Sequence, residues 1–183
     1  CEETMAALGG ERVVEAVNFN APGQVAISGH RDAIERAVAD APRRGARKGV
    51  MLPVSVPNHS SLMREPGAAL AEAIAALEGP PSAWRMPSVP LVQNAPASAP
   101  ASLAELLERL RDHVFSPVRW TRTIEALRDG HGVTTVLEAG PGKVLTGLGK
   151  RIDRKLPTLP VESPETLAAA LGALTISTEG AEA

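Results

Sequence analysis

Apolar and polar positions alternate along one stretch of the chain, residues 49–63, which reads GVMLPVSVPNHSSLM. Its apolar residues recur at every second position and are mostly β-branched, which predicts a short and mostly buried strand over Val50–Val56. A Pro-Asn pair ends this strand, because proline lacks the N–H that a sheet ladder needs. His59 follows at once, and Ser60 and Ser61 can cap a helix. The pattern therefore predicts a histidine between a strand and a helix, where α/β folds carry much of their chemistry.

Two interpretations of His59 stay open on position alone. A lone histidine at the boundary of an element can be a packing or capping residue, and it can also be an acid or base. No G-x-S-x-G stretch in the sequence supplies a nucleophile elbow beside it. His and Cys residues do not cluster at metal-ligand spacing, so we expect no metal site.

The residues before this stretch predict a β-hairpin and a helix. Val13, Val14 and Val17 lead into a first strand, residues 18–24 (NFNAPGQ) read as a polar turn, and residues 25–28 form a second strand. Apolar positions at helical spacing then predict a helix from about Arg31 to Ala41. A basic cluster follows, which is either a solvated turn or a phosphate contact. Its members are Arg43, Arg44, Arg47 and Lys48.

Helical patterns dominate the region after His59. The expected elements are a helix over 65–77, a strand over 89–92, a helix from Ser102 to about Val114 and a helix over 118–127. Ser102 and Glu105 form a capping box at the start of the third element. Ser116-Pro117 separates the last two helices.

The end of the chain repeats a strand, glycine turn and helix. We expect a strand over 134–139, a helix over 143–152, a last strand over 159–161 and a terminal helix from Ser163, with a disordered tail beyond Thr175. The turn between the first two elements reads GPGK. Such a turn either packs a helix tightly on a sheet or receives an anion on free backbone N–H groups. It fits neither the P-loop nor the dinucleotide fingerprint.

Composition narrows the class of protein. The chain has 183 residues, of which 44% are hydrophobic and 22% charged, as in a globular protein with a real core. A net charge of -2 and only 2% aromatic residues argue against nucleic acid or an anionic membrane as partner. Cys1 is the only cysteine, which favours a reducing compartment. With neither a spanning segment nor a signal peptide in the sequence, we expect a cytoplasmic protein. Because the chain begins with Cys, we also expect that the start of a longer protein is missing.

Four segments together resemble malonyl-CoA:acyl carrier protein transacylase of type II fatty acid synthesis. They are VNFNAPGQVAISG, LPVSVPNHSSLM, SPVRWTRTIEAL and LEAGPGKVLTGLGKRI, they occur in the family's order, and the match runs from about Val13 to Ile152. The acyltransferase domains of modular polyketide synthases are related to the same family. The resemblance implies an α/β fold, an α/β-hydrolase-like large domain with an inserted ferredoxin-like subdomain. Residues 1–54 would be that subdomain without its first strand, residues 55–175 the closing part of the large domain, and residues 176–183 a tail.

The resemblance also implies roles for two histidines. His59 matches the catalytic histidine of a V-P-x-H motif, a general base and acid toward a serine that attacks the malonyl thioester. That serine lies in a G-H-S-x-G elbow before the subdomain and is therefore expected outside this chain. The family orients the imidazole through the backbone carbonyl of the residue four before the P-V-x-W proline. This residue is often Gln in the family and is His113 here.

Substrate contacts follow from the same resemblance. Asn18, Asn20 and Gln24 match the subdomain loop that faces the cleft, and Arg47 and Lys48 match basic positions near its entrance. We expect these five residues to contact CoA phosphates or the acidic carrier protein. Malonyl-CoA and the phosphopantetheine of the acyl carrier protein are substrates, so no cofactor is expected. The expected partners are those two substrates and the N-terminal part of the same enzyme.

Two hypotheses of different class follow. The chain is part of a working acyltransferase, or it is a non-catalytic fragment or paralogue that binds carrier protein or CoA. A polyketide synthase acyltransferase domain is a variant of the first hypothesis. We expect residues 1–183 alone not to transfer malonyl groups, because they hold a base and no nucleophile.

Overall fold

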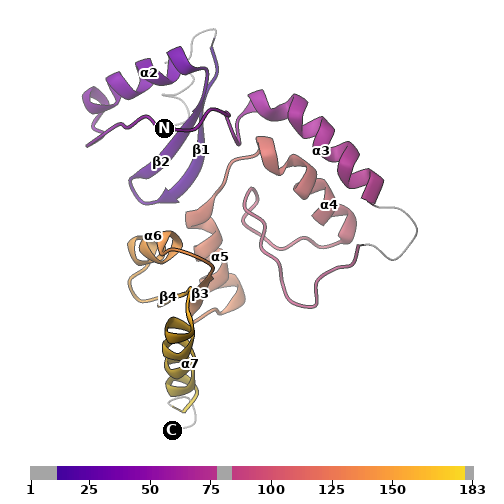
Figure 1. Cartoon of the computed structure of the whole chain (residues 1–183), viewed down its shortest axis with the longest axis vertical. Helices are drawn as coiled ribbons and strands as arrows, with labels where there is room; N and C mark the ends of the chain where they lie inside the picture. The colour runs from indigo at the N-terminus through magenta and orange to yellow at the C-terminus, as the bar shows by residue number, and fades with distance from the viewer. Residues whose placement is uncertain (1–11, 78–83, 180–183) are drawn as a thin grey trace. The chain divides into compact units, whose positions relative to one another are not determined.

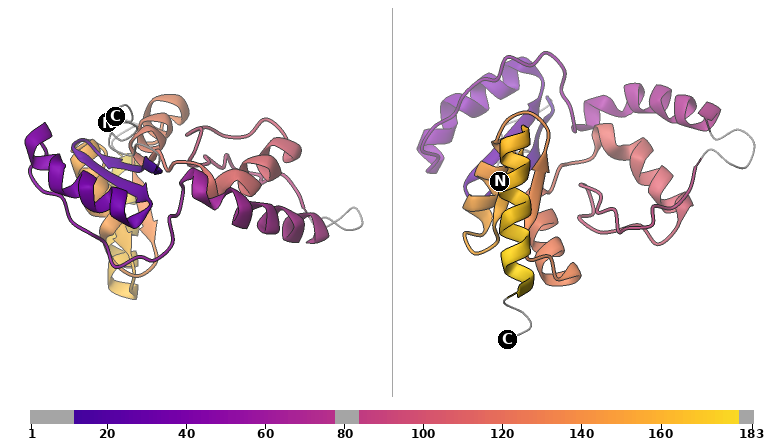
Figure 2. Two further views of the ribbon diagram at one scale, coloured as in Figure 1. Left: turned by 90° about the horizontal axis from the view of Figure 1, so that it is seen from above. Right: turned by 60° about the horizontal axis from the view of Figure 1, so that its bottom comes forward.

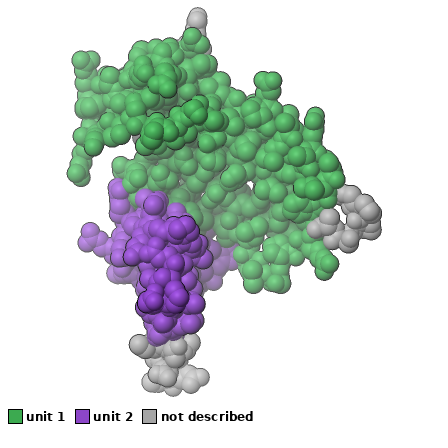
Figure 3. Space-filling view, viewed as in Figure 1, with its two compact units in different colours: residues 1–123 green, residues 124–183 purple. Residues whose placement is uncertain are grey.

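A computed structural model describes residues 12–77 and 84–179 of the chain (Figure 1). The chain forms two compact units, residues 1–123 and residues 124–183, which Figure 3 colours separately. The predicted subdomain boundary after residue 54 falls inside the first unit. None of the described helices combines the length and the apolar character that crossing a membrane requires.

The first unit begins with the predicted β-hairpin. Strand β1 (Val14–Ala21) pairs antiparallel with β2 (Gln24–Gly29). The polar residues after Val17 were expected to form a turn, but they continue β1 to Ala21, with two shifts of register. The turn itself is Pro22-Gly23, where Gly23 has the positive φ of 73° that glycine adopts without strain.

Helix α2 (Arg31–Asp40) covers this hairpin, as Figures 1 and 2 show. Its apolar stripe is buried through Ala33 and Ala37, which pack with Val14 of β1. A short 3-10 helix, η1 (Ala41–Arg44), follows directly. The predicted helix from Arg31 to Ala41 is confirmed within one residue.

The named elements in the rest of the first unit are helices, joined by irregular segments. They include η2 (Ser61–Met63), α3 (Arg64–Leu77), α4 (Leu103–Asp112) and η3 (His113–Phe115). Helices α3 and α4 lie side by side and bury Ile74, Leu106 and Leu107 between them. The predicted cap of α4 is present, since the Ser102 side chain accepts a hydrogen bond from the Glu105 N–H at 3.2 Å.

Two predicted strands are wrong. Residues 50–56 and 89–92 are irregular, and their apolar side chains are exposed, with Leu52 at 61% and Val89 at 69%. A strand needs a neighbour to pair its backbone N–H and C=O groups. Both described sheets have two strands, and neither sheet includes these segments.

Helix α5 (Trp120–His131) leads from the first unit into the second. There β3 (Val136–Ala139) pairs in parallel with β4 (Thr158–Val161), and α6 (Val144–Ile152) connects them. The last helix, α7 (Pro164–Glu179), continues beyond Thr175, where the tail was expected to begin. Cys1 and residues 180–183 of that tail lie outside the described residues.

Candidate functional site

The backbone of His59 adopts a conformation that few residues other than glycine hold. Its φ is 65°, in the left-handed region, where a Cβ atom crowds the backbone and costs roughly 1 kcal/mol or more. The His59 N–H donates a hydrogen bond of 2.8 Å to the Val114 carbonyl, and the next residue, Ser60, is fully buried. The surrounding contacts therefore hold this residue in a strained position.

The imidazole of His59 is fixed by two carbonyl groups of one turn. Its Nδ1 atom lies 3.1 Å from the carbonyl oxygen of His113 and 3.1 Å from that of Ser116. Because a carbonyl oxygen only accepts hydrogen bonds, Nδ1 carries the proton in the neutral ring. The lone pair is then on Nε2, which bonds no described residue. The half-buried ring therefore has a defined tautomer, with a lone pair on Nε2 that can accept a proton.

The contact that the resemblance implied for His113 is thus present in the structure. Its side chain makes a second contact, since the two imidazole rings meet edge to face with centroids 5.4 Å apart. Burial, and in addition the neighbouring His59, lower the pKa of His113. His113 is therefore mainly neutral at pH 7, and its side chain places no positive charge beside the His59 ring.

Packing between α3 and η3 keeps this turn beside His59. The Arg64 guanidinium lies over the Phe115 ring at 5.0 Å. Gly67 faces the same ring so closely that a Cβ atom there would lie 2.7 Å from it. The absence of a side chain at Gly67 therefore lets the helix after His59 reach the turn that holds its ring.

Glu15 is a part of the site that sequence reasoning missed. Its carboxylate accepts hydrogen bonds from the Ser61 N–H at 2.8 Å and from the Ser61 hydroxyl at 2.5 Å. The signal was a single carboxylate within the apolar stretch 13–17, between Val14 and Ala16. A charge in such a strand needs a partner, and Ser61, 46 positions later, supplies it.

Asn18 and Asn20 lie on β1, the strand that contacts both sides of the histidine site. Between them, the Phe19 N–H donates to the Val118 carbonyl at 2.8 Å, two residues after Ser116. Gln24 is at the start of β2, opposite Ala21. The structure thus places the two asparagines on the element that supports the site, and Gln24 at the far end of the hairpin.

Arg47 and Lys48 lie apart from this arrangement. Both are exposed, in the irregular segment that follows η1. Arg44 of the same basic cluster pairs with Asp40 at 2.5 Å, whereas no ion pair among the described residues engages Arg47 or Lys48. They are thus available to an anionic ligand, and no described contact joins them to His59.

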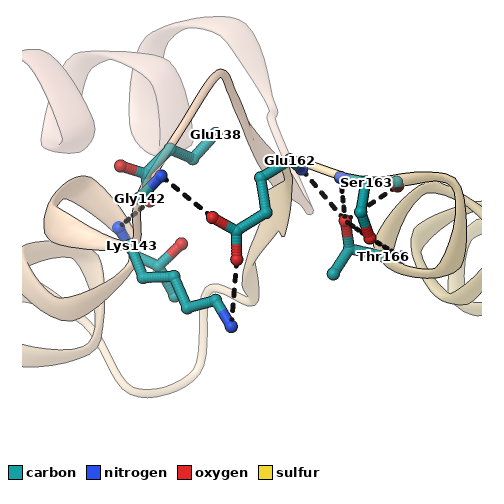
Figure 4. A network of polar contacts seen from close by, with 7 residues as sticks. Glu138, Gly142, Lys143, Glu162, Ser163 and Thr166 are labelled. Atoms are coloured by element: carbon teal, nitrogen blue, oxygen red, sulfur yellow. Dashed lines mark hydrogen bonds and ion pairs between the residues drawn. The ribbon is translucent and has the colours of Figure 1, made fainter.

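The GPGK turn of the second unit binds carboxylates of its own chain (Figure 4). Glu138 accepts hydrogen bonds from the Leu145 and Thr146 N–H groups at 2.9 and 2.6 Å. Glu162 accepts from the Gly142 N–H at 2.9 Å and pairs with Lys143. These two carboxylates occupy the N–H groups that an anion would use. The second predicted interpretation, an anion site, is therefore not supported, and Gly140 and Gly142 are used for their positive φ values of 132° and 94°.

The electrostatics of this turn agree with its hydrogen bonds. Burial alone would raise the pKa of Glu138, but hydrogen bonds from Thr146, Leu145 and Val144 outweigh it and the pKa is lowered. The Gly142 N–H, and in addition Lys143, lower the pKa of Glu162. Across the described part of the chain, no three His, Cys, Asp or Glu side chains group as a metal site would need.

Comparison with known proteins finds curated relatives that all carry the same protein name. No family model matches the chain. Malonyl CoA-acyl carrier protein transacylases of Salmonella typhimurium and Escherichia coli are 40% and 41% identical to it over 171 residues, which are 93% of this chain and 52% of each relative. The Bacillus subtilis protein of that name is 38% identical over 162 residues, 88% of this chain and 49% of the relative. The chain spans about half the length of the curated relatives it matches.

Solved structures agree with these relatives. The malonyl-CoA:acyl carrier protein transacylase (FabD) of Xanthomonas oryzae pv. oryzae superposes with a TM-score of 0.86 at 42% identity, over 94% of this chain and 53% of that one. A type II polyketide synthase acyl carrier protein in complex with its malonyl-transacylase matches with a TM-score of 0.87 at 35% identity, over 94% of this chain and 54% of that one. The predicted resemblance and the predicted mixed α/β fold class are both confirmed.

Proposed function

Because the chain is homologous to malonyl-CoA:acyl carrier protein transacylases over nearly all of its length, we propose that it supplies the catalytic base of such an enzyme. The observation that carries this proposal is the geometry of His59. Two carbonyl groups fix its Nδ1 proton, and its Nε2 lone pair is left for a reacting group. The resemblance to the family's V-P-x-H motif implies the catalytic histidine at this position and supports the proposal.

In the first half of the reaction, His59 acts as base and then as acid. Nε2 takes the proton of the serine hydroxyl, whose oxygen attacks the malonyl thioester carbon. The carbon–sulfur bond breaks, a seryl ester forms, and the departing CoA thiolate takes the proton back from the imidazolium. The serine belongs to the G-H-S-x-G elbow that the resemblance implies and is outside this chain.

The second half of the reaction uses the same ring in the same order. Nε2 takes the proton of the pantetheine thiol on the acyl carrier protein, and the thiolate attacks the seryl ester. The ester carbon–oxygen bond breaks, and the serine oxygen recovers its proton from His59. A carbonyl partner suits this double duty, because it fixes the tautomer of the ring without adding a charge.

Five residues are proposed as substrate contacts. Asn18, Asn20 and Gln24 would face the acyl carrier protein or CoA from the hairpin, and Arg47 and Lys48 would bind CoA phosphates or acidic side chains of the carrier protein. Their support is the exposure of the two basic residues and the position of the asparagines on β1. Both substrates are consumed in the reaction, so the proposal needs no cofactor, and it places the protein in the cytoplasm.

The proposal is tested in a complemented enzyme. We define this as the present chain joined to the part of the Salmonella typhimurium relative that it does not match. After incubation with malonyl-CoA, mass spectrometry of the intact protein is expected to reveal one malonyl ester. Addition of acyl carrier protein bearing phosphopantetheine should remove the ester and malonylate the carrier. The chain without the added part is the matched control and should form no ester.

Absence of both the ester and the malonylated carrier from a folded complemented enzyme would contradict the proposed function. If that protein still binds CoA or carrier protein, the non-catalytic alternative is supported. Transfer by the control chain alone would show that the nucleophile is not the implied serine.

A further inference from the structure

Glu15 connects the hairpin to the residue pair that follows the base. It lies near the start of β1, and its carboxylate binds both the backbone N–H and the hydroxyl of Ser61. These bonds lie on the C-terminal side of His59, separated from it only by the fully buried Ser60. The Ser60 hydroxyl is itself bonded to the Pro57 carbonyl at 2.6 Å. The backbone is thus fixed on both sides of His59.

The same strand also holds the turn that orients the ring. Val118 donates its N–H to the Val17 carbonyl at 2.8 Å and accepts the Phe19 N–H at 2.8 Å. The Thr121 hydroxyl adds a bond to the Phe19 carbonyl at 3.2 Å. Val118 is two residues after Ser116, whose carbonyl receives the Nδ1 proton of His59. Strand β1 therefore binds both loops of the site, one through Glu15 and the other through its backbone.

The two contacts of β1, with Val118 and with Ser61, differ in how they respond to substitutions in the strand. The contact with Val118 uses backbone atoms, so substitutions along β1 leave it in place. The contact with Ser61 depends on one side chain, and a carboxylate offers acceptors on both oxygens where an amide offers only one. The position of His59 relative to its carbonyl partners thus depends on Glu15 more than on any other side chain of β1.

We propose that Glu15 is a positioning residue for the base: through Ser61 it holds His59 in its left-handed conformation, with Nδ1 on the carbonyls of the 113–116 turn. The inference rests on the proposed function for its effect on turnover, but its effect on the ring is independent of that function. Without the hydrogen bonds from Ser61 to Glu15, the ring samples other orientations and the second tautomer, in which Nε2 is protonated and cannot act as a base.

The test compares Glu15→Gln and Ser61→Ala with Glu72→Gln, a matched control on α3 whose side chain is exposed. Nitrogen-15 NMR of the imidazole in the 183-residue chain reports the tautomer of His59. The original chain and the control should carry the proton on Nδ1, and Glu15→Gln should give a mixture. In the complemented enzyme, Glu15→Gln should lower kcat roughly 10- to 100-fold with the KM for malonyl-CoA nearly unchanged.

A rescue variant separates positioning from a general loss of structure. Ser61→Thr keeps the hydroxyl and should retain the tautomer and most of the turnover that Ser61→Ala loses. An unchanged tautomer in both Glu15→Gln and Ser61→Ala would overturn the inference. So would a loss of stability in Ser61→Ala that Ser61→Thr shares. If the unaltered complemented enzyme transfers no malonyl group, the proposed function fails, and the ring spectra still decide the role of Glu15.

Discussion

At the scale of single residues, the site combines a strained backbone with an uncharged acceptor. His59 has a positive φ, and its ring faces two carbonyl oxygens in place of the carboxylate of a Ser-His-Asp triad. A carbonyl fixes the same tautomer as a carboxylate does. Because the acceptor belongs to the main chain, the side chain of His113 is free to differ without loss of the hydrogen bond.

The pH dependence of stability tests the environment of His113. Its ordinary pKa is 6.5, and burial together with His59 lowers it in the folded chain. The unfolded chain therefore binds more protons, and the free energy of unfolding should fall as the pH drops below 6.5 and level off below the folded pKa. In His113→Gln this contribution disappears, so its stability should depend less on pH between 7 and 5.

Urea unfolding at a series of pH values measures this difference. Ser88→Ala, which replaces an exposed residue and leaves every titratable group in place, is the control and should keep the slope of the unaltered chain. An equal slope in the His113 variant and the unaltered chain would contradict the assigned environment. The complemented enzyme with His113→Gln should retain transfer at pH 8, since the carbonyl remains.

Arg47 and Lys48 make a separate prediction about substrate binding. Both side chains are exposed, so each contact with an anion contributes little in water. Replacing either by Ala in the complemented enzyme should raise the KM for CoA ester or carrier protein about two- to fivefold and leave kcat nearly unchanged. The increase should shrink at high salt. Arg31→Ala on α2 is a control that removes the same charge. An equal rise in KM in that variant would contradict a specific contact of Arg47 or Lys48 with the substrate.

At the scale of elements, local sequence signals predicted the helices well. Apolar spacing identified α2, a capping serine identified the start of α4, and a glycine turn identified the start of α6, because each signal acts within a few residues of the helix. The hairpin was predicted, and so were β3 and β4 as separate strands, but their parallel pairing was not. The segments 50–56 and 89–92 were predicted as strands from the same kind of pattern and are irregular, because a strand depends on a neighbour that its own sequence does not contain.

The site itself could be predicted only in part. His59 and His113 are 54 positions apart, so no spacing argument joins them, and the family resemblance supplied the pair. Glu15 contacts Ser61 across 46 positions and was not found. Pattern reasoning identifies residues on the same element, whereas the chemistry here combines three elements through tertiary contacts.

Two glycines of α6 give a prediction about packing between elements. A Cβ atom on Gly149 would lie 2.3 Å from the Thr158 hydroxyl oxygen of β4, whereas one on Gly147 would meet nothing within 4 Å. Gly149→Ala should therefore lower the free energy of unfolding by about 1–3 kcal/mol. Gly147→Ala should leave it unchanged or raise it by about 1 kcal/mol, because Ala favours a helix. Urea unfolding compares the two, and equal stabilities would contradict the described packing.

At the scale of the whole molecule, the segment 50–56 exposes apolar side chains that no described element covers. Val50, Leu52, Val54 and Val56 are 56, 61, 58 and 46% exposed. Their alternation is that of a buried strand, and the residue after Asn58 is the proposed base. The relatives are about twice as long as this chain, and we expect a neighbour strand for this segment in their additional length.

Hydrogen exchange tests this interpretation. In the 183-residue chain the amides of residues 50–56 should exchange rapidly, because Val54, which donates to Leu52, is the one amide of this segment with a described backbone bond. In the complemented enzyme the same amides should exchange at least about tenfold more slowly, as those of a paired strand do. The amides of α2 serve as a reference that should not change. Equal exchange in both proteins would mean that the segment remains unpaired.

The central claim is that His59 is the base of a malonyl transfer, and its removal tests that claim most directly. The measurement is the rate at which the complemented enzyme forms the malonyl ester from malonyl-CoA, before and after His59→Ala. The account predicts a fall of roughly two to four decades, the usual contribution of a positioned acid–base group. A His59→Ala variant that is acylated at the rate of the unaltered enzyme would contradict it.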